Sequence, residues 1–177
     1  RRQRQMCIRD SRIFVEDVEH SLRFYRDILG LSLTEVVIWN GHRCLFLRAN
    51  TEHHSLALYP LSLRSALGLR PETSFFSFGM QLGDYQQLRN ARDFLTGHGV
   101  KFRNLPPELF PGIDYNAFAE DPEGNLIQLY YYMEQIGWDG KPRPAHMRPK
   151  IDPQNWPDHV PAQSDSFLGE VYLGPLN

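Results

Sequence analysis

The fold is decided by the stretch Glu52-His53-His54-Ser55-Leu56-Ala57-Leu58-Tyr59-Pro60, in which two histidines precede a short apolar run closed by proline. Such a run predicts a buried strand with one end at a pocket. The stretch Asp121-Pro122-Glu123-Gly124-Asn125-Leu126-Ile127-Gln128-Leu129-Tyr130 repeats the pattern of a polar turn followed by a strand that ends in tyrosine. In this alignment Ala57 corresponds to Gln128. The repeat indicates two copies of one unit.

Both copies show the same order of expected elements. The first, residues 11–60, contains a strand at 11–16, a helix between Asp17 and Gly30, and strands at 31–39, 43–48 and 54–59. The second, residues 74–132, contains a strand at 74–82, a helix after Asp84, and strands at 100–104, 115–119 and 126–132. The sequence therefore predicts an α+β fold within a domain at 11–136. Two βαβββ modules form a cup-shaped, eight-stranded open barrel around a ligand site.

Local signals support these elements. Asp17 and Asp84 are typical N-cap residues, and Asn40-Gly41 between two apolar runs is a strong hairpin signal. Apolar residues recur at helical spacing after each cap and are expected to face the core. They are Val18, Leu22, Tyr25, Ile28 and Leu29 in the first unit, and Tyr85, Leu88, Ala91, Phe94 and Leu95 in the second.

Length and composition favour a single core with an appended tail. The chain has 177 residues, of which 41% are hydrophobic, enough for one duplicated domain. It has no apolar run long enough for a membrane helix and no signal-peptide pattern, so we expect a soluble cytoplasmic protein. From Gly137 the composition becomes rich in proline. We expect residues 137–177 to form an irregular tail over the core or over a partner subunit of a homo-oligomer.

Residues 1–10, Arg1-Arg2-Gln3-Arg4-Gln5-Met6-Cys7-Ile8-Arg9-Asp10, resemble the in-frame translation of a transposase adapter used in sequencing libraries. We therefore expect them not to belong to the natural protein and to pack against nothing. Without their net charge of +3, the formal charge moves from −2 to −5, which disfavours nucleic-acid binding. Cys7 is removed with them, and Cys44 is left without a disulfide partner, which favours a reducing compartment.

Three motifs carry a family resemblance. Val15-Glu16-Asp17, the helix motif Ser21-Leu22-Arg23-Phe24-Tyr25-Arg26-Asp27-Ile28-Leu29-Gly30-Leu31, and Asp121-Pro122-Glu123-Gly124-Asn125 resemble the vicinal oxygen chelate superfamily of glyoxalases, bleomycin resistance proteins and extradiol dioxygenases. The resemblance covers residues 12–132. The segment at 52–57 is most similar to the C-terminal, catalytic half of type I extradiol dioxygenases. One fold of this kind hosts several chemistries, so the resemblance is more specific for fold than for function.

For the site, the resemblance implies an acid–base histidine at His54, next to His53. Imidazole suits this role because its pKa lies near neutrality. It also implies three metal-ligand positions, which hold Asp10, Ser77 and Gln128 in place of two histidines and a glutamate. Ser77 and Gln128 are poor ligands, so no metal ligand is assigned. Fe(II) or Mn(II) is expected only if the natural first strand and neighbouring groups complete a site.

The ligand expected in the cup is a small aromatic or phenolic molecule, because many strand residues facing the cup are aromatic. Phe118 stands where the family has a tyrosine that assists the chemistry. The candidate substrate-binding residues are Ser77, Phe118, Tyr115, Asp114 and Gln128.

Three functions stay open. The first is an extradiol-dioxygenase-like protein that binds a phenolic molecule, with ring cleavage assisted by His54. The second is a metal-free binding protein of the drug-sequestering kind, which Ser77 and Gln128 favour. The third is a glyoxalase-like isomerase or lyase, which usually takes a metal ligand from the last strand of each unit, where Ala57 and Gln128 stand. Metal content and oxygen consumption with catechols would separate them.

Overall fold

The computed structural model describes residues 8–69, 74–121, 124–137, 140–148, 151–152 and 155–160. The first module contains β1 (Ile8–Val15), α1 (Val18–Leu22) continuing as π-helical turns over Arg23–Ile28, β2 (Ser32–Trp39), β3 (His42–Arg48) and β4 (Leu56–Pro60). A short helix, α2 (Leu61–Ala66), follows. The second module contains β5 (Phe75–Gln81), α3 (Tyr85–Gly97), β6 (Phe102–Arg103), β7 (Ile113–Glu120) and β8 (Leu126–Met133). Two 3-10 turns, η2 (Pro107–Leu109) and η3 (Ala145–Met147), complete the elements.

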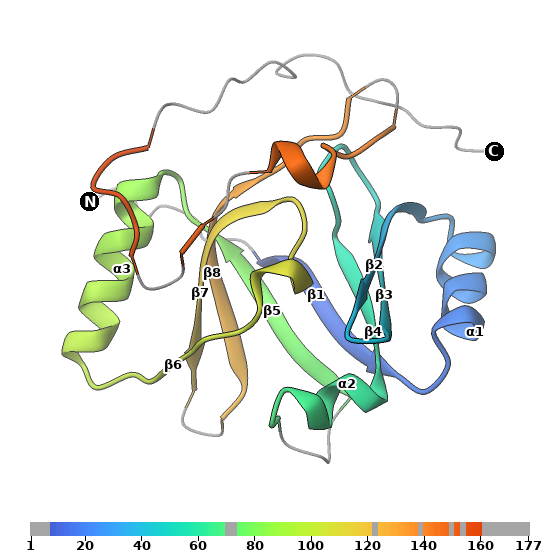
Figure 1. The fold of residues 1–177 in the computed structure, drawn as a ribbon, viewed down its shortest axis with the longest axis horizontal. Coiled ribbons are helices and arrows are strands. Elements are labelled where there is room, and N and C mark those ends of the chain that lie inside the picture. Colours follow the sequence, from blue (N-terminus) through green and yellow to red (C-terminus); the bar gives the residue numbers. More distant parts are fainter. Residues whose placement is uncertain are drawn as a thin grey trace.

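The described strands form one eight-stranded mixed sheet in the order β2-β3-β4-β1-β5-β8-β7-β6. This order is symmetric about the antiparallel pair β1 and β5. On each side the first strand pairs in parallel with the last strand of its own module, β1 with β4 and β5 with β8. The sheet curves without closing, and α1 and α3 lie on opposite outer sides of it (Figure 1). The predicted α+β fold of two βαβββ modules is confirmed.

The local signals act as their chemistry predicts. Asp17 Oδ1 accepts hydrogen bonds from the backbone N–H groups of Glu19 and His20, both at 2.9 Å. The β2–β3 turn places Asn40 at φ 46° and Gly41 at φ 80°, the left-handed conformations of a type I′ hairpin. These caps and turns fix the ends of the elements and therefore the register of the sheet.

The core follows the two sides of the sheet. The concave side is filled by aromatic and aliphatic side chains from both modules, including Phe14, Phe46, Tyr59, Phe76 and Phe118. Separate clusters join α1 and α3 to the convex side. The cup is therefore largely packed with its own side chains.

Part of each helical face differs from expectation. Ile28 and Leu29 are 76% and 59% exposed, because the helix widens into π-helical turns after Leu22 and the spacing that would bring them inward is lost. Phe94 is 63% exposed and packs its ring on His98, at a centroid distance of 4.2 Å. No helix in the described ranges is both long and apolar enough to cross a membrane.

The expectation that residues 1–10 pack against nothing is wrong for the end of that segment. Residues 1–7 lie outside the described residues, but β1 begins at Ile8, where the chain pairs with Met80 of β5. Asp10 is buried, and Arg9 Nη1 lies 3.0 Å from Glu52 Oε1. These residues pack because they extend the pairing of β1 with β5 and because the carboxylate of Asp10 is buried.

The described part of the tail packs on the core. Tyr85 O–H donates to Pro157 O at 2.5 Å, and the Trp156 ring packs against both Tyr85 and Tyr115, at centroid distances of 6.2 and 6.0 Å. Arg143 Nη2 donates to Asp114 Oδ1 at 2.9 Å. The described residues of the tail therefore cover the end of the sheet where β7 begins (Figure 1).

Candidate functional site

A chain of hydrogen bonds and close contacts runs through the two histidines. His53 Nε2 lies 2.8 Å from Glu35 Oε2 on β2, and His53 Nδ1 lies 2.9 Å from His54 Nδ1. His54 Nε2 lies 3.3 Å from Asp10 Oδ2, at ion-pair distance without hydrogen-bond geometry. Both imidazoles are fully buried. This row of contacts therefore joins the half-buried carboxylate of Glu35 to the buried carboxylate of Asp10 through the two imidazole rings.

Two features of the backbone hold His53 in its place within this row of contacts. His53 N–H donates to Glu134 O at 2.8 Å, and an isolated bridge pairs Glu52 with Gln135. Gly112, at φ 77°, lies so close to the His53 ring that a Cβ at this position would overlap it. A glycine is required here for both the positive φ and the close approach.

Burial and charge set the protonation of these groups. Burial lowers the pKa of His53 to about 4, although the hydrogen bond to Glu35 opposes the shift. Burial alone would raise the pKa of Glu35, but hydrogen bonds from His53 and Arg148 outweigh it and lower that pKa. His53 is therefore neutral near neutral pH. Because ionised Glu35 can only accept, the proton of His53 lies on Nε2, and its Nδ1 accepts the proton of His54 Nδ1.

Arg12 lies next to Asp10, at the buried end of this row of contacts. Its guanidinium is fully buried, donates through Nη2 to Asp10 Oδ2 and through Nη1 to Ser77 Oγ at 3.2 Å, and stands 5.2 Å from the centre of the Phe110 ring. Burial alone would raise the pKa of Asp10, but Arg12 and His54 together lower it. Asp10 and Arg12 are a buried ion pair.

The three positions that the family resemblance assigns to metal ligands lie close together, but the residues there do not fit a divalent metal. Asp10 Oδ2 and Ser77 Oγ both accept hydrogen bonds from Arg12, so these oxygens already face a cation, whereas Asp10 Oδ1 is buried without a partner among the described residues. Gln128 is buried, and its two amide atoms have no hydrogen-bond partner among the described residues. No group of three or more His, Cys, Asp or Glu side chains in the described ranges is arranged to hold a metal ion.

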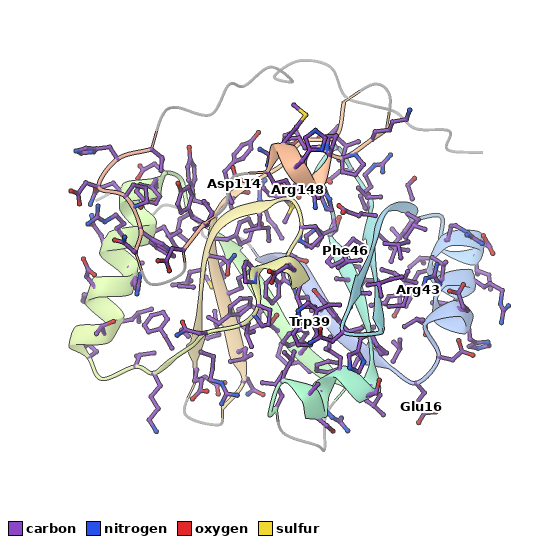
Figure 2. All side chains as sticks on the ribbon, in the orientation of Figure 1. Glu16, Trp39, Arg43, Phe46, Asp114 and Arg148 are labelled. Carbon is purple, nitrogen blue, oxygen red and sulfur yellow. The ribbon has the colours of Figure 1, made fainter. Side chains whose placement is uncertain are left out.

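A cavity of about 480 Å³ lies beside the buried chain, between the loop that joins β6 to β7 and the tail; we call it the loop cavity. Its aromatic lining is Phe102, Phe110, Phe118 and Trp156, and its charged lining is Arg92, Arg103, Glu108, Asp114 and Arg148. In Figure 2, Asp114 and Arg148 are both labelled in the upper middle of the view, and both line the cavity. Two of its lining residues face the buried cluster, since Gly112 lies against the His53 ring and Phe110 lies against Arg12.

The loop cavity opens on an unextended edge of β7. Glu120 N–H donates to Lys101 O at 2.9 Å, so even-numbered residues of β7 direct their backbone groups away from β8. The register of β6 ends at Phe118. The backbone N–H and C=O of Asn116, which lines the cavity, therefore point to an edge that no described strand extends. A donor and an acceptor stand there side by side.

The structure divides the expected site residues into three groups. His53, His54, Ser77 and Gln128 belong to the buried polar cluster, and none of them lines the loop cavity. Asp114 and Phe118 line it. Tyr115 lies on the opposite face of β7, with its ring 4.7 Å from that of Tyr85.

Sequence reasoning missed Arg12, Glu35, Arg148 and Trp156. Glu35 stands inside a strand with apolar residues on both sides, and this position could have signalled a buried charge, whereas Arg12 follows the polar residues Arg9-Asp10-Ser11 and gives no such signal. Arg148 and Trp156 lie in the irregular tail, where no periodicity marks residues that return to the core.

Known proteins resemble this chain in sequence pattern and fold. Residues 8–129 match the glyoxalase/bleomycin resistance protein/dioxygenase superfamily. No curated protein matches the sequence. Among solved structures, 2,2',3-trihydroxybiphenyl 1,2-dioxygenase from Sphingomonas wittichii strain RW1 is 22% identical, with a TM-score of 0.59 over 73% of this chain and 43% of that chain.

Two further structures are similar. Homoprotocatechuate 2,3-dioxygenase from Brevibacterium fuscum, in complex with 3,4-dihydroxyphenylacetate, is 18% identical, with a TM-score of 0.58 over 75% of this chain and 38% of that chain. The 2,3-dioxygenase LapB from Pseudomonas sp. KL28 is 16% identical, with a TM-score of 0.58 over 76% of this chain and 45% of that chain. The chain thus spans less than half the length of these enzymes. Identities this low support a shared fold alone.

Proposed function

The chain belongs to the glyoxalase/bleomycin resistance protein/dioxygenase superfamily, and within it we propose that the protein binds a small aromatic or phenolic molecule in the loop cavity. The observation that carries the proposal is the cavity itself. Its volume of about 480 Å³ suits a molecule with one or two rings, and Phe102, Phe110, Phe118 and Trp156 offer flat apolar walls.

The polar edge of the cavity suits a phenol. The backbone N–H and C=O of Asn116 present one donor and one acceptor, and a hydroxyl group can serve both at once. The terminal nitrogens of Arg148, at the tail side, are held by Glu35, and its Nε has no partner among the described residues and would be the donor left for a ligand oxygen. The ligand class is also that of the Brevibacterium fuscum structure, which holds 3,4-dihydroxyphenylacetate.

Calorimetry with the full chain in EDTA tests the proposal. Catechol and 3,4-dihydroxyphenylacetate are expected to bind more tightly than 1,2-dimethoxybenzene, which lacks the hydroxyl donors. Ala145→Phe places a ring at the cavity wall and should weaken binding at least ~10-fold, a loss of about 1.4 kcal/mol. Ala66→Phe, at an exposed position of α2 outside the cavity, is the matched control. Equal binding by both variants, or no binding by the parent chain, would refute the proposal.

A second function, proton transfer to or from a phenolic ligand, is favoured by the hydrogen bonds among Glu35, His53 and His54. They keep a proton on Nδ1 of His54, whose Nε2 faces Asp10 and not the loop cavity, so a ligand would have to reach the buried cluster to exchange a proton with this ring. His54→Ala would then abolish turnover and change affinity little, because His54 does not line the cavity. Oxygen consumption with catechol is measured after anaerobic Fe(II) incubation and again in EDTA. Iron-dependent uptake would contradict metal-free binding.

A further inference from the structure

Arg12 is a fully buried arginine in a strand whose next residues are the apolar Ile13-Phe14-Val15. A buried guanidinium is costly unless a counter-charge and hydrogen-bond acceptors meet it. Here Asp10 supplies the charge, Ser77 supplies a hydroxyl acceptor at 3.2 Å, and Phe110 presents its ring face. Each of these three partners comes from a different segment of the fold, so the position of Arg12 is held from several sides.

The strand register puts this guanidinium among the three family ligand positions. Arg12 is the direct partner of Ser77 across the β1–β5 pair, and Asp10 is the partner of Gly79. Gly79 is in turn the partner of Gln128 on β8. A Cβ built on Gly79 would stand 3.1 Å from Asp10 Cβ and 3.2 Å from Gln128 Oε1. The three positions therefore converge, and the Arg12 side chain reaches two of them.

We propose that the Arg12 guanidinium is a built-in cation that takes the place of a divalent metal in this chain and keeps one out. It neutralises the carboxylate at the first position and donates to the oxygen at the second. A metal held by Asp10 Oδ2 and Ser77 Oγ would have to displace both hydrogen bonds. One held by Asp10 Oδ1, which has no partner among the described residues, would still lie beside a fixed positive charge, which repels it strongly where water is excluded. The repulsion persists because an arginine side chain keeps its charge in proteins.

The third position is consistent with this assignment. Both amide atoms of Gln128 and the hydroxyl of Tyr130 are buried without a hydrogen-bond partner in the described part of the chain. Buried polar atoms of this kind are normally met by water. Neutral donors and acceptors around a guanidinium–carboxylate pair suit a water molecule, whereas a divalent ion would need further negative charge.

Restoring the ligands tests the proposal with the full chain. The triple variant Asp10→His, Ser77→His, Gln128→Glu recreates two imidazoles and a carboxylate. It also replaces Asp10, which lies in the segment expected to be adapter-derived. Adding Arg12→Met removes the cation, and adding Arg12→Lys instead keeps it. Fe(II) affinity is measured anaerobically by competition with a chromophoric chelator, and iron per chain is measured after gel filtration.

The Arg12→Met form is expected to bind Fe(II) at least ~100-fold more tightly than the triple variant or its Arg12→Lys form. Circular dichroism establishes folding. If Arg12→Met unfolds, Arg12→Gln removes the charge and keeps a hydrogen-bond donor for Ser77. Stoichiometric tight iron in the triple variant with Arg12 present would overturn the proposal, as would a folded Arg12→Met or Arg12→Gln form that binds no better. The proposed function is tested separately, by catechol binding in EDTA, and that test does not depend on the iron affinities measured here.

Discussion

Both terminal nitrogens of the Arg148 guanidinium donate to the Glu35 carboxylate, at 3.0 and 2.6 Å, and this pair joins the tail to β2 of the first module. The same arginine lines the loop cavity, and the same glutamate accepts from His53. One ion pair therefore connects the cavity wall with the buried histidines.

Arg148→Ala is expected to lower the free energy of unfolding by about 1–2 kcal/mol, less than for a fully buried pair because both side chains retain some exposure. Chemical denaturation near neutral pH measures the loss. Catechol affinity should also fall, since the cavity loses part of its wall. Arg26→Ala, which breaks an exposed pair with Asp27, should change neither quantity. Equal effects of the two substitutions would show that the tail contact contributes nothing specific.

Stability should decrease as pH falls from about 7 to about 5, because His53 stays neutral when folded but gains a proton when unfolded. Its folded pKa is about 4 against 6.5 for the free side chain, so the unfolded state binds more protons throughout this window. The loss attributable to His53 is about 2 kcal/mol. His53→Asn should flatten the pH dependence measured by denaturation. His20→Asn, at an exposed site, should leave it unchanged. An unaltered slope in His53→Asn would contradict the assignment.

Gly112→Ala should destabilise the protein by about 2–4 kcal/mol, because the new methyl group overlaps the His53 ring and the residue keeps a positive φ. Gly99→Ala is a matched control, with a nearly equal φ of 76° and open space around its Cβ, and should cost only about 1 kcal/mol. Thermal and chemical denaturation give both values. Costs that agree within error would mean that the backbone near His53 moves freely aside.

The fold could be predicted from the sequence because its signals are local and repeated. Asp17 caps the first helix, Asn40-Gly41 closes a hairpin, and the strand that carries Tyr59 matches the strand that carries Tyr130. Each signal acts within a few residues of itself. Two copies of the same set then leave few ways to build one sheet.

The site was less predictable because its contacts are distant in sequence. Glu35 meets His53 across 18 positions, and Arg148 meets Glu35 across 113. Neither contact leaves a periodic signal. The loop cavity depends on the path of the loop after Arg103, which proline and glycine permit but do not specify. Residue types at family positions were therefore visible in the sequence, whereas the partners that decide their chemistry were not.

Asp10→Asn tests the buried ion pair directly. The substitution keeps the size of the side chain but removes the charge that faces Arg12 and His54, so a fully buried guanidinium loses its counter-ion. We expect a loss of about 3 kcal/mol in the free energy of unfolding near neutral pH. Because the folded pKa of Asp10 is lowered, this contribution is present above the unfolded pKa of the carboxyl and disappears as pH falls through the folded value. The double variant Asp10→Asn, Arg12→Met removes both charges and should recover part of the loss. Asp27→Asn, at an exposed pair, should have no measurable effect. If Asp10→Asn is as stable as the parent chain, the carboxylate at position 10 does not hold Arg12, and the guanidinium must be balanced by other groups.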